Sequence, residues 1–161
     1  MRKAADQTMQ VVVFELAGQT YGMDINNVLE IIRPEAVTQV PGTPDFIEGV
    51  IKLRGQVILV IDLAKRFGLA RPGRVSEHSK IIIVEAGGTT VGMVVDGVSE
   101  VLRFSGSQIK PPPEIVTSRA TAYLQGIVLI DEQLIILLDA HRILYEREKE
   151  ALEEAAAAAG I

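Results

Sequence analysis

The hydrophobic positions of this chain fall into short apolar runs separated by polar turns, a pattern typical of β-strands. Residues 10–16 read QVVVFEL, and the turn AGQ separates them from TYGMDI at 20–25, where apolar and polar positions roughly alternate. Two such runs around a short turn predict a β-hairpin. The next stretch, NNVLEII at 26–32, fits either a short helical turn or a strand. GVIKLRGQVILVIDL at 49–63 predicts a second, more apolar hairpin.

This pattern occurs twice. Residues 14–33 align with residues 84–103 at a constant shift of 70 positions, and residues 48–67 align with residues 125–144 at a shift of 77. In the first alignment the identical residues are Glu15, Gly18, Thr20, Gly22, Met23, Val28, Glu30 and Arg33. In the second, half of the differing pairs exchange one aliphatic residue for another. Because both alignments keep the same order, we predict two copies of one unit of about 70 residues.

Each predicted unit holds a hairpin, a connector with proline, and a second hairpin. A unit of this size buries only roughly 60% of its surface, so one copy alone would be marginally stable. We therefore expect two small β-barrels that pack against each other, with a groove where they meet. The expected parts are a flexible N-terminus at 1–9, a first barrel at about 10–70 and a second at about 80–145, with some strand exchange possible.

The end of the chain differs from the rest. Residues 139–160 are rich in Ala, Glu, Leu, Arg and Lys, which predicts a helix that Asp139 could cap. Ile143 and Leu144 are placed to pack on a barrel. We expect the Ala/Glu-rich residues 146–161 to be helical or frayed.

Composition argues against most kinds of chemistry. The chain has no cysteine, which excludes disulfides, thiolate metal sites and cysteine nucleophiles. Its two histidines show no metal-ligand spacing, and the sequence contains neither a Walker loop nor a nucleophile elbow. Asp62 and Asp139 occupy equivalent positions before helix-like stretches and suit helix N-caps better than a catalytic pair. We predict no catalytic residue, no metal site and no cofactor.

Arg54 is unusual because it lies within an apolar hairpin. Arg54-Gly55 occupies the turn of the first copy, and Asp131-Glu132 occupies the equivalent turn of the second. Arg54 either points into solvent or pairs with a carboxylate, for which Glu30 is the natural candidate. An exposed pair contributes about 0–1 kcal/mol to folding, so its value would lie in fixing the geometry of a docking surface.

Three segments carry a resemblance to a known family: VVFELAGQTYGMDINNVLEIIRP, PGTPDFIEGVIKLRGQVILVIDLAKRFG and GMVVDGVSEVLRF. They resemble CheW, the coupling protein of bacterial and archaeal chemotaxis, over about residues 10–145. The resemblance implies two five-stranded SH3-like β-barrels with a hydrophobic groove between them. It also implies a cytoplasmic, non-enzymatic adaptor that joins the regulatory domain of the histidine kinase CheA to the cytoplasmic tips of methyl-accepting chemoreceptors in membrane-associated arrays, without inserting into the membrane.

The same resemblance suggests which residues do this. Those that match positions used around receptor and kinase coupling are Glu30, Gly49, Arg54 and Gly55. Those that match apolar positions along the receptor groove are Val28, Ile31, Val98 and Val101, although each could equally be a core residue. For the kinase contact we favour the connector with Val40, Pro41 and Phe46, and Phe46 could also fill the core.

Two other classes of function remain as alternatives. Small barrels often bind nucleic acid through a basic face studded with aromatic residues. Here aromatic residues make up only 4% of the chain and the net charge is −5, which disfavours a nucleic-acid partner. An enzyme with an unfamiliar site has less support, because no cluster of titratable residues suggests one.

Overall fold

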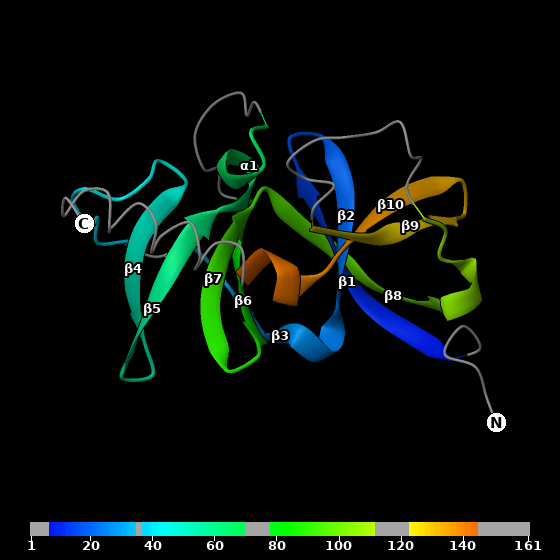
Figure 1. The fold of residues 1–161 in the computed structure, drawn as a ribbon, viewed down its shortest axis with the longest axis horizontal. Coiled ribbons are helices and arrows are strands. Elements are labelled where there is room, and N and C mark those ends of the chain that lie inside the picture. Colours follow the sequence, from blue (N-terminus) through cyan, green and yellow to red (C-terminus); the bar gives the residue numbers. More distant parts are fainter. Residues whose placement is uncertain (1–6, 35–36, 70–77, 112–122, 145–161) are drawn as a thin grey trace, which may run out of the picture.

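The computed structural model describes residues 7–34, 37–69, 78–111 and 123–144. This part of the chain forms ten β-strands and a short helix α1, and residues 140–144 are also helical (Figure 1). The elements are β1 (Thr8–Leu16), β2 (Gln19–Asp24), β3 (Val28–Ile32), β4 (Ile47–Leu53), β5 (Gln56–Asp62), α1 (Leu63–Arg66), β6 (Lys80–Ala86), β7 (Thr89–Val95), β8 (Gly97–Ser105), β9 (Leu124–Ile130) and β10 (Gln133–Leu138).

The strands form two five-stranded sheets. One has the order β8-β1-β2-β10-β9 and is called barrel I here, and the other has the order β3-β6-β7-β5-β4 and is called barrel II. Under the sequence repeat, β1 to β5 correspond in turn to β6 to β10, and this correspondence converts the first order into the second. The predicted fold class, two five-stranded units with a helix after the last strand, is confirmed.

Neither barrel is built from one half of the sequence. Barrel I combines the β1–β2 hairpin with β8, β9 and β10, while barrel II combines the β6–β7 hairpin with β3, β4 and β5. The expected division at about 10–70 and 80–145 therefore separates the two sequence copies but not the two sheets. The exchanged pairings are equivalent, because β6 is the copy of β1 and β3 pairs with β6 just as β8 pairs with β1.

Each sheet closes through one isolated bridge between the segment that follows its first edge strand and its opposite edge. Thr38 bridges to Val50 of β4 in barrel II, and Lys110 bridges to Ile127 of β9 in barrel I. The backbones approach closely at these bridges, because a Cβ placed on Gly49 would overlap the carbonyl oxygen of Thr38. Glycine is therefore required at this position by the closure of the barrel.

The apolar runs are continuous because the central strands are buried on both faces. Val11 and Val13 of β1 face the interior of barrel I, whereas Phe14 and Leu16 of the same strand face a core shared by both barrels. Barrel II has its own interior around Ile51, Val60 and Ile83. The shared core, called the central core here, is built from Phe14, Leu16, Tyr21, Met23, Phe46, Ile61, Leu63, Phe67, Ile82, Val84, Val91, Met93, Val95, Tyr123, Leu138, Ile143 and Leu144, with Ala64 and Ala140.

Two aspartates cap the helical segments that follow them. The Asp62 side chain accepts from the backbone N–H of Lys65, and Asp139 accepts from those of His141 and Arg142, so both cap helices as predicted. The helical residues 140–144, orange in Figure 1, lie between the barrels, with Ile143 buried in the central core.

β1 begins earlier than expected, and β3 follows a short 3-10 helix. Residues 8 and 9 were expected in a flexible segment but belong to β1, because Thr8 and Met9 pair with Ser105 and Phe104. The stretch 26–32 contains both predicted alternatives, a 3-10 helix (Ile25–Asn27) followed by β3. The expected tail at 146–161 lies outside the described residues. None of the helices in the described ranges is long and apolar enough to cross a membrane.

All four two-residue hairpins turn through left-handed backbone. Both central residues have positive φ at Ala17-Gly18, Arg54-Gly55, Gly87-Gly88 and Asp131-Glu132. Paired positive φ values define type I′ turns, whose twist matches that of the flanking strands. Three of the turns place glycine second, but the fourth holds Glu132 at a φ of 66°. This turn therefore carries the strain of a side chain in left-handed backbone.

We predict that Glu132→Gly stabilises the protein. Relief of left-handed strain should outweigh the added flexibility of the unfolded chain, and raise the free energy of unfolding by about 0.5–1 kcal/mol. The urea midpoint of unfolding measures this. Gly55→Ala is the matched reverse change, because a Cβ there meets no atom within 4 Å and only the backbone is strained. A lower midpoint for Glu132→Gly would contradict the prediction.

Because Tyr21 is buried, we predict that the free energy of unfolding decreases at alkaline pH. Burial raises its pKa above the ordinary 10.0, because the phenolate is poorly solvated inside the protein. The stability contributed by the protonated phenol is present below about pH 10 and is lost as the pH rises through the folded-state pKa. Urea unfolding between about pH 8 and 11 should show a smaller alkaline loss for Tyr21→Phe than for the wild type. Superimposable pH profiles would show that Tyr21 does not ionise on unfolding in this range.

Candidate functional site

Arg54 and Glu30 form an exposed ion pair on barrel II. Arg54 Nε lies 3.2 Å from Glu30 Oε2, and Arg54 Nη2 lies 3.4 Å from Glu30 Oε1. The predicted contact is therefore present, with each carboxylate oxygen facing one guanidinium nitrogen. The Arg54 side chain is 78% exposed and that of Glu30 is 28% exposed, so solvent screens the pair and it adds little to stability.

Local structure explains how the two side chains meet. Arg54 occupies the β4–β5 turn at a φ of 53°, and Glu30 lies on β3. The strands β3 and β4 are the two ends of the sheet order in barrel II, and closure of the barrel brings them together. A register shift between Val28 and Glu30 in the pairing with β6 leaves Leu29 as an extra residue. The pair therefore links the two sides of the barrel seam.

The second sequence copy lacks this pair. Glu100 is the copy of Glu30 and lies on β8, beside an equivalent register shift that leaves Ser99 extra. The copy of Arg54, however, is Asp131, and Glu132 follows it. The duplicated fold thus presents an ion pair on barrel II and only acidic residues at the equivalent positions of barrel I.

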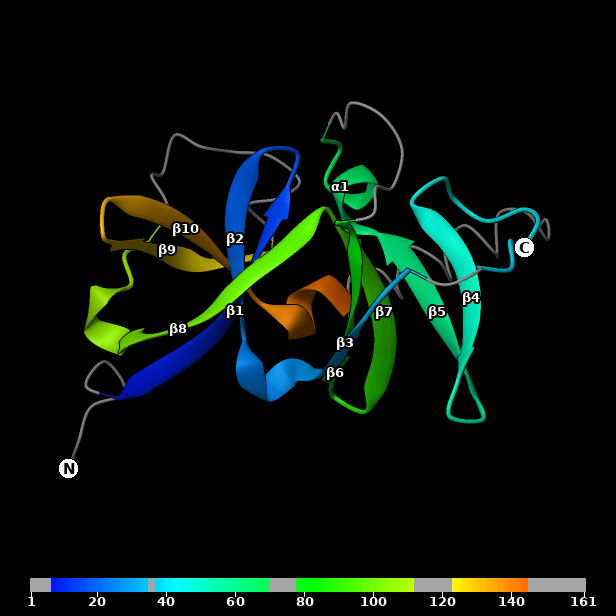
Figure 2. The ribbon, with the colours of Figure 1, turned by 180° about the vertical axis from the view of Figure 1, so that it is seen from behind.

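The four predicted groove residues divide into two classes. Val28 and Val98 are half-buried and pack against the central core. Ile31 and Val101 are 39% and 50% exposed. Val28 and Ile31 come from β3 of barrel II, and the other two come from β8 of barrel I, which Figure 2 shows running across the near side of the molecule. Ile31 and Val101 therefore offer most of the surface that a partner could contact directly.

Two exposed apolar residues near the ion pair were not predicted. Leu29 lies at the extra position beside Glu30, and Val57, which is 73% exposed, lies on β5 just after the Arg54-Gly55 turn. The sequence repeat offers one signal that could have identified Leu29. Its copy is Ser99, and a polar residue is the ordinary choice at an exposed extra position, so leucine there is unusual. The exposed part of β3, with Leu29, Glu30 and Ile31, is called the β3 surface below, together with Arg54, which pairs with Glu30.

The two predicted glycines have backbone roles. Gly49 is buried at the barrel closure with a φ of 142°, so it has no surface for a partner to contact. Gly55 is exposed and supplies the second positive φ of the hairpin turn. Both glycines therefore shape the backbone of the β4–β5 hairpin, whose turn carries Arg54.

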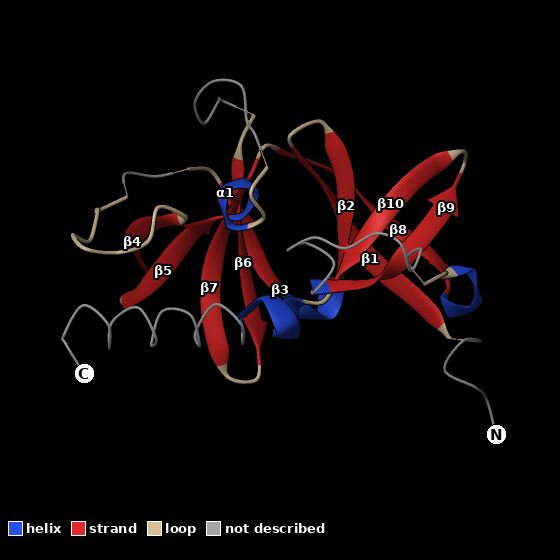
Figure 3. Cartoon of the chain, turned by 45° about the horizontal axis from the view of Figure 1, so that its top comes forward, coloured by secondary structure: helices blue, strands red, loops and turns tan. Residues whose placement is uncertain are grey.

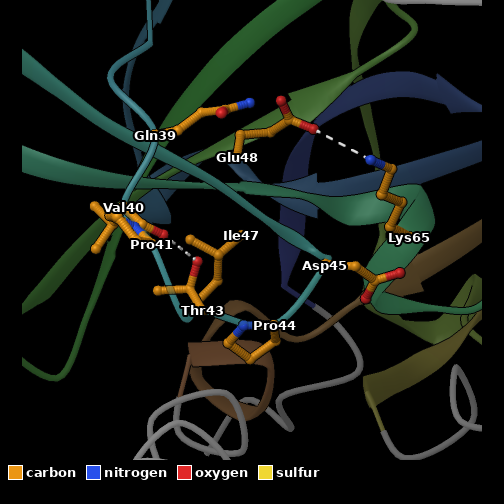
Figure 4. Close-up of a pocket in the computed structure, with 9 residues that line it drawn as sticks. All are labelled: Gln39, Val40, Pro41, Thr43, Pro44, Asp45, Ile47, Glu48 and Lys65. Atoms are coloured by element: carbon orange, nitrogen blue, oxygen red, sulfur yellow. Dashed lines mark hydrogen bonds and ion pairs between the residues drawn. The ribbon is translucent and has the colours of Figure 1, made fainter.

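The connector before β4 borders a pocket of about 350 Å³ (Figure 4). The lining residues are Gln39, Val40, Pro41, Thr43, Pro44, Asp45, Ile47, Glu48 and Lys65. Lys65 Nζ lies 3.8 Å from Glu48 Oε1 at one side, and Thr43 Oγ1 donates to the Val40 carbonyl at 2.8 Å. Two of the three residues predicted here, Val40 and Pro41, are exposed on this pocket.

Phe46 fills the core instead. Its ring is buried in the central core, and the guanidinium carbon of Arg66 lies 5.1 Å from the ring centroid. The same guanidinium lies 5.0 Å from the Tyr123 ring, so Arg66 is held between two aromatic faces. Phe46 therefore anchors the connector to the central core. The alternative that assigned it to the core is confirmed.

Comparison with known proteins places this geometry in a family. The model of the CheW-like domain matches residues 10–148. The chain is 38% identical over 157 residues to Chemotaxis protein CheW of Klebsiella aerogenes, covering 96% of this chain and 93% of the relative. It is 33% identical over 148 residues to Chemotaxis protein CheW of Thermotoga maritima, covering 91% and 95%.

A solved structure is also similar. The crystal structure of the scaffolding protein TtCheW from Thermoanaerobacter tengcongensis matches with a TM-score of 0.78 and 44% sequence identity. The match covers 84% of this chain and 91% of that chain.

We predict that Gly49→Ala acts through folding. The added methyl group would collide with backbone and occupy a φ that disfavours it, lowering the free energy of unfolding by about 2–4 kcal/mol. Urea unfolding measures the change. Gly97→Ala is the control, because a Cβ there would lie 3.8 Å from the nearest atom, the His78 carbonyl oxygen. Wild-type stability in Gly49→Ala would show that the closure tolerates a side chain.

Proposed function

Since this chain belongs to the CheW-like domain family, we propose that it is a non-enzymatic adaptor that couples methyl-accepting chemoreceptors to the histidine kinase CheA. The relatives are named as chemotaxis and scaffolding proteins, so a scaffold role in chemotaxis follows from membership. Our proposal goes one step further and identifies the two partners as the chemoreceptors and CheA. The family match also favours this reading over a nucleic-acid-binding barrel.

One observation carries the proposal: the two copies share a fold but not a surface. The Arg54–Glu30 pair stands among exposed apolar residues on barrel II, and its equivalents on barrel I are acidic. A pair so exposed contributes about 0–1 kcal/mol to stability, so folding alone gives little reason to keep it. Apolar contact area with one oriented charge pair is the composition expected of a specific docking surface.

We assign the β3 surface, together with Val101 of β8, to the receptor. The cytoplasmic tip of a chemoreceptor is a helical hairpin, and an amphipathic helix presents apolar residues at intervals of three and four positions. Leu29, Ile31 and Val101 would contact that stripe. Val28 and Val98 would support these residues from the central core, and the Arg54–Glu30 pair would fix the register of the helix by hydrogen bonding to its polar side.

We assign the pocket beside the connector to the regulatory domain of the kinase. Val40 and Pro41 offer apolar surface, and Lys65, Glu48 and Asp45 provide charges around it. Proline limits the freedom of the connector, so little entropy is lost when a partner docks. Phe46 would hold this surface in place without touching the partner.

The proposed mechanism is geometric. Receptor and kinase bind different surfaces of one rigid body, so a shift at the receptor tip changes the position of the kinase domain without any bond being made. Such a shift can favour one kinase state only by differential contact with the two states. Many weak contacts in a membrane-associated array on the cytoplasmic side would add through effective concentration.

We predict that Arg54→Glu reduces receptor binding at least about tenfold while leaving stability within about 0.5 kcal/mol, because the pair is exposed. The measurement is co-sedimentation of the purified chain with a receptor fragment, with and without the kinase. Glu30→Arg should act in the same way. Glu100→Arg is the matched control, because Glu100 is the copy of Glu30 on barrel I.

The kinase surface provides the reciprocal measurement. Val40→Asp should weaken kinase binding and retain receptor binding, the opposite of Arg54→Glu. Full receptor binding by both Arg54→Glu and Glu30→Arg would remove the β3 surface from the proposal. Equal loss in Glu100→Arg would show that the effect is one of net charge.

A further inference from the structure

Arg66, the last residue of α1, carries a buried charge that the proposed function does not use. The residue is 1% exposed, and it is the only cation among the buried residues in the described ranges. Burial of a guanidinium is costly because the group loses its hydration, so a fully buried arginine is rare. Its presence in the central core indicates that the charge itself has a use.

The guanidinium joins the two barrels. Its central carbon lies 5.1 Å from the centroid of the Phe46 ring and 5.0 Å from that of the Tyr123 ring. Phe46 directly precedes β4 of barrel II, and Tyr123 directly precedes β9 of barrel I. Figures 1 and 3 both show α1 near the junction of the barrels, with β4 on one side and β9 on the other. A planar cation attracted to both rings therefore links the two barrels through the core.

The sequence repeat shows that the fold does not require this cation. At the shift of 77 positions that relates the copies, Phe46 corresponds to Tyr123 and Arg66 corresponds to Ile143. Ile143 is 0% exposed and lies in the same central core. An aliphatic side chain thus fills the equivalent position of the second copy, so packing alone does not explain an arginine in the first.

Arg66 and Phe46 are core residues whose chain neighbours line the pocket beside the connector. Asp45 and Ile47 flank Phe46, Lys65 precedes Arg66, and all three line this pocket (Figure 4). One wall of the pocket is therefore carried by the connector and β4, and another is carried by α1. The contact between the guanidinium and the Phe46 ring connects these two walls from within the core.

We propose that Arg66 is a positioning residue for the pocket that the proposed function assigns to the kinase regulatory domain, and this role rests on that proposed function. The guanidinium holds Phe46 in one orientation and so fixes the connector against α1, while Tyr123 ties both to barrel I. The pocket is then formed before the partner docks, so less conformational entropy is lost on binding. Arg66 acts through Phe46 and Lys65 and does not touch the partner.

Amide hydrogen exchange of the full chain tests the positioning without any partner. Arg66→Met removes the charge and should fold, because Ile143 fills the equivalent position. The Asp62 amide donates to the Phe46 carbonyl oxygen at 2.7 Å, and its exchange should become at least about fivefold faster because the connector opens locally more often. Exchange of the Ile127 amide, at the closure of barrel I, should stay at the wild-type rate.

Binding to a fragment of the kinase regulatory domain gives the second readout. Arg66→Met should weaken this binding about tenfold and leave receptor binding unchanged. Arg66→Lys is the matched variant, because lysine and methionine have similar lengths but only lysine keeps a positive charge near the rings. It should lose less than Arg66→Met in both readouts, whereas a role in packing alone would make the two variants equal. Ile143→Met, at the copy-equivalent position, should bind the kinase like the wild type.

These variants separate the positioning of the pocket from the assignment of the kinase to it. Wild-type exchange at Asp62 in Arg66→Met, or equal effects of Arg66→Met and Arg66→Lys, would overturn the positioning role. Normal kinase binding by Arg66→Met would also overturn it if Val40→Asp loses that binding, because the kinase would then not need the pocket to be held. If Val40→Asp also binds the kinase normally while exchange at Asp62 is faster in Arg66→Met, the positioning stands and the proposed kinase surface fails.

Discussion

The structure depends on the apolar contact between the two barrels in the central core. The strands of the hairpins β1–β2 and β6–β7 are buried on both faces, one inside a barrel and the other in the shared core. Rings link the two sides: Tyr21 lies 6.4 Å from Phe67, and Phe67 stacks on Tyr123 at 5.3 Å. Because this apolar core is continuous across both barrels, we expect the surfaces on either barrel to keep a fixed relation to each other.

Symmetry in the backbone coexists with asymmetry on the surface. The copies agree in strand order, in the extra residues Leu29 and Ser99, and in the bridges that close each barrel. They differ where the backbone places side chains in solvent, as at Arg54 and Asp131. Packing constrains the first group of positions strongly and the second hardly at all, so the two copies can differ on the surface without a cost in packing.

Sequence reasoning recovered features that local chemistry decides. The repeat, the hairpins and the caps at Asp62 and Asp139 follow from residue type and spacing, and the Arg54–Glu30 contact was one of two alternatives for Arg54. The exchange of strands was allowed as a possibility but could not be decided, because β6 resembles β1 and a strand has no local preference between two equivalent edges. The burial of Arg66 between Phe46 and Tyr123 was also missed, since the three residues are distant in sequence and a buried guanidinium is unusual.

Reciprocal strand exchange has a consequence for cooperativity. The β1–β2 hairpin lies in barrel I, and the strands that follow it, β3 to β5, lie in barrel II. The β6–β7 hairpin lies in barrel II, and the strands that follow it lie in barrel I. Unfolding of either barrel therefore pulls on chain segments that belong to the other. Loss of structure is thereby coupled across the whole molecule, as in a single two-state domain. We therefore expect a force applied to one barrel to act on the other as well, because neither barrel can open alone.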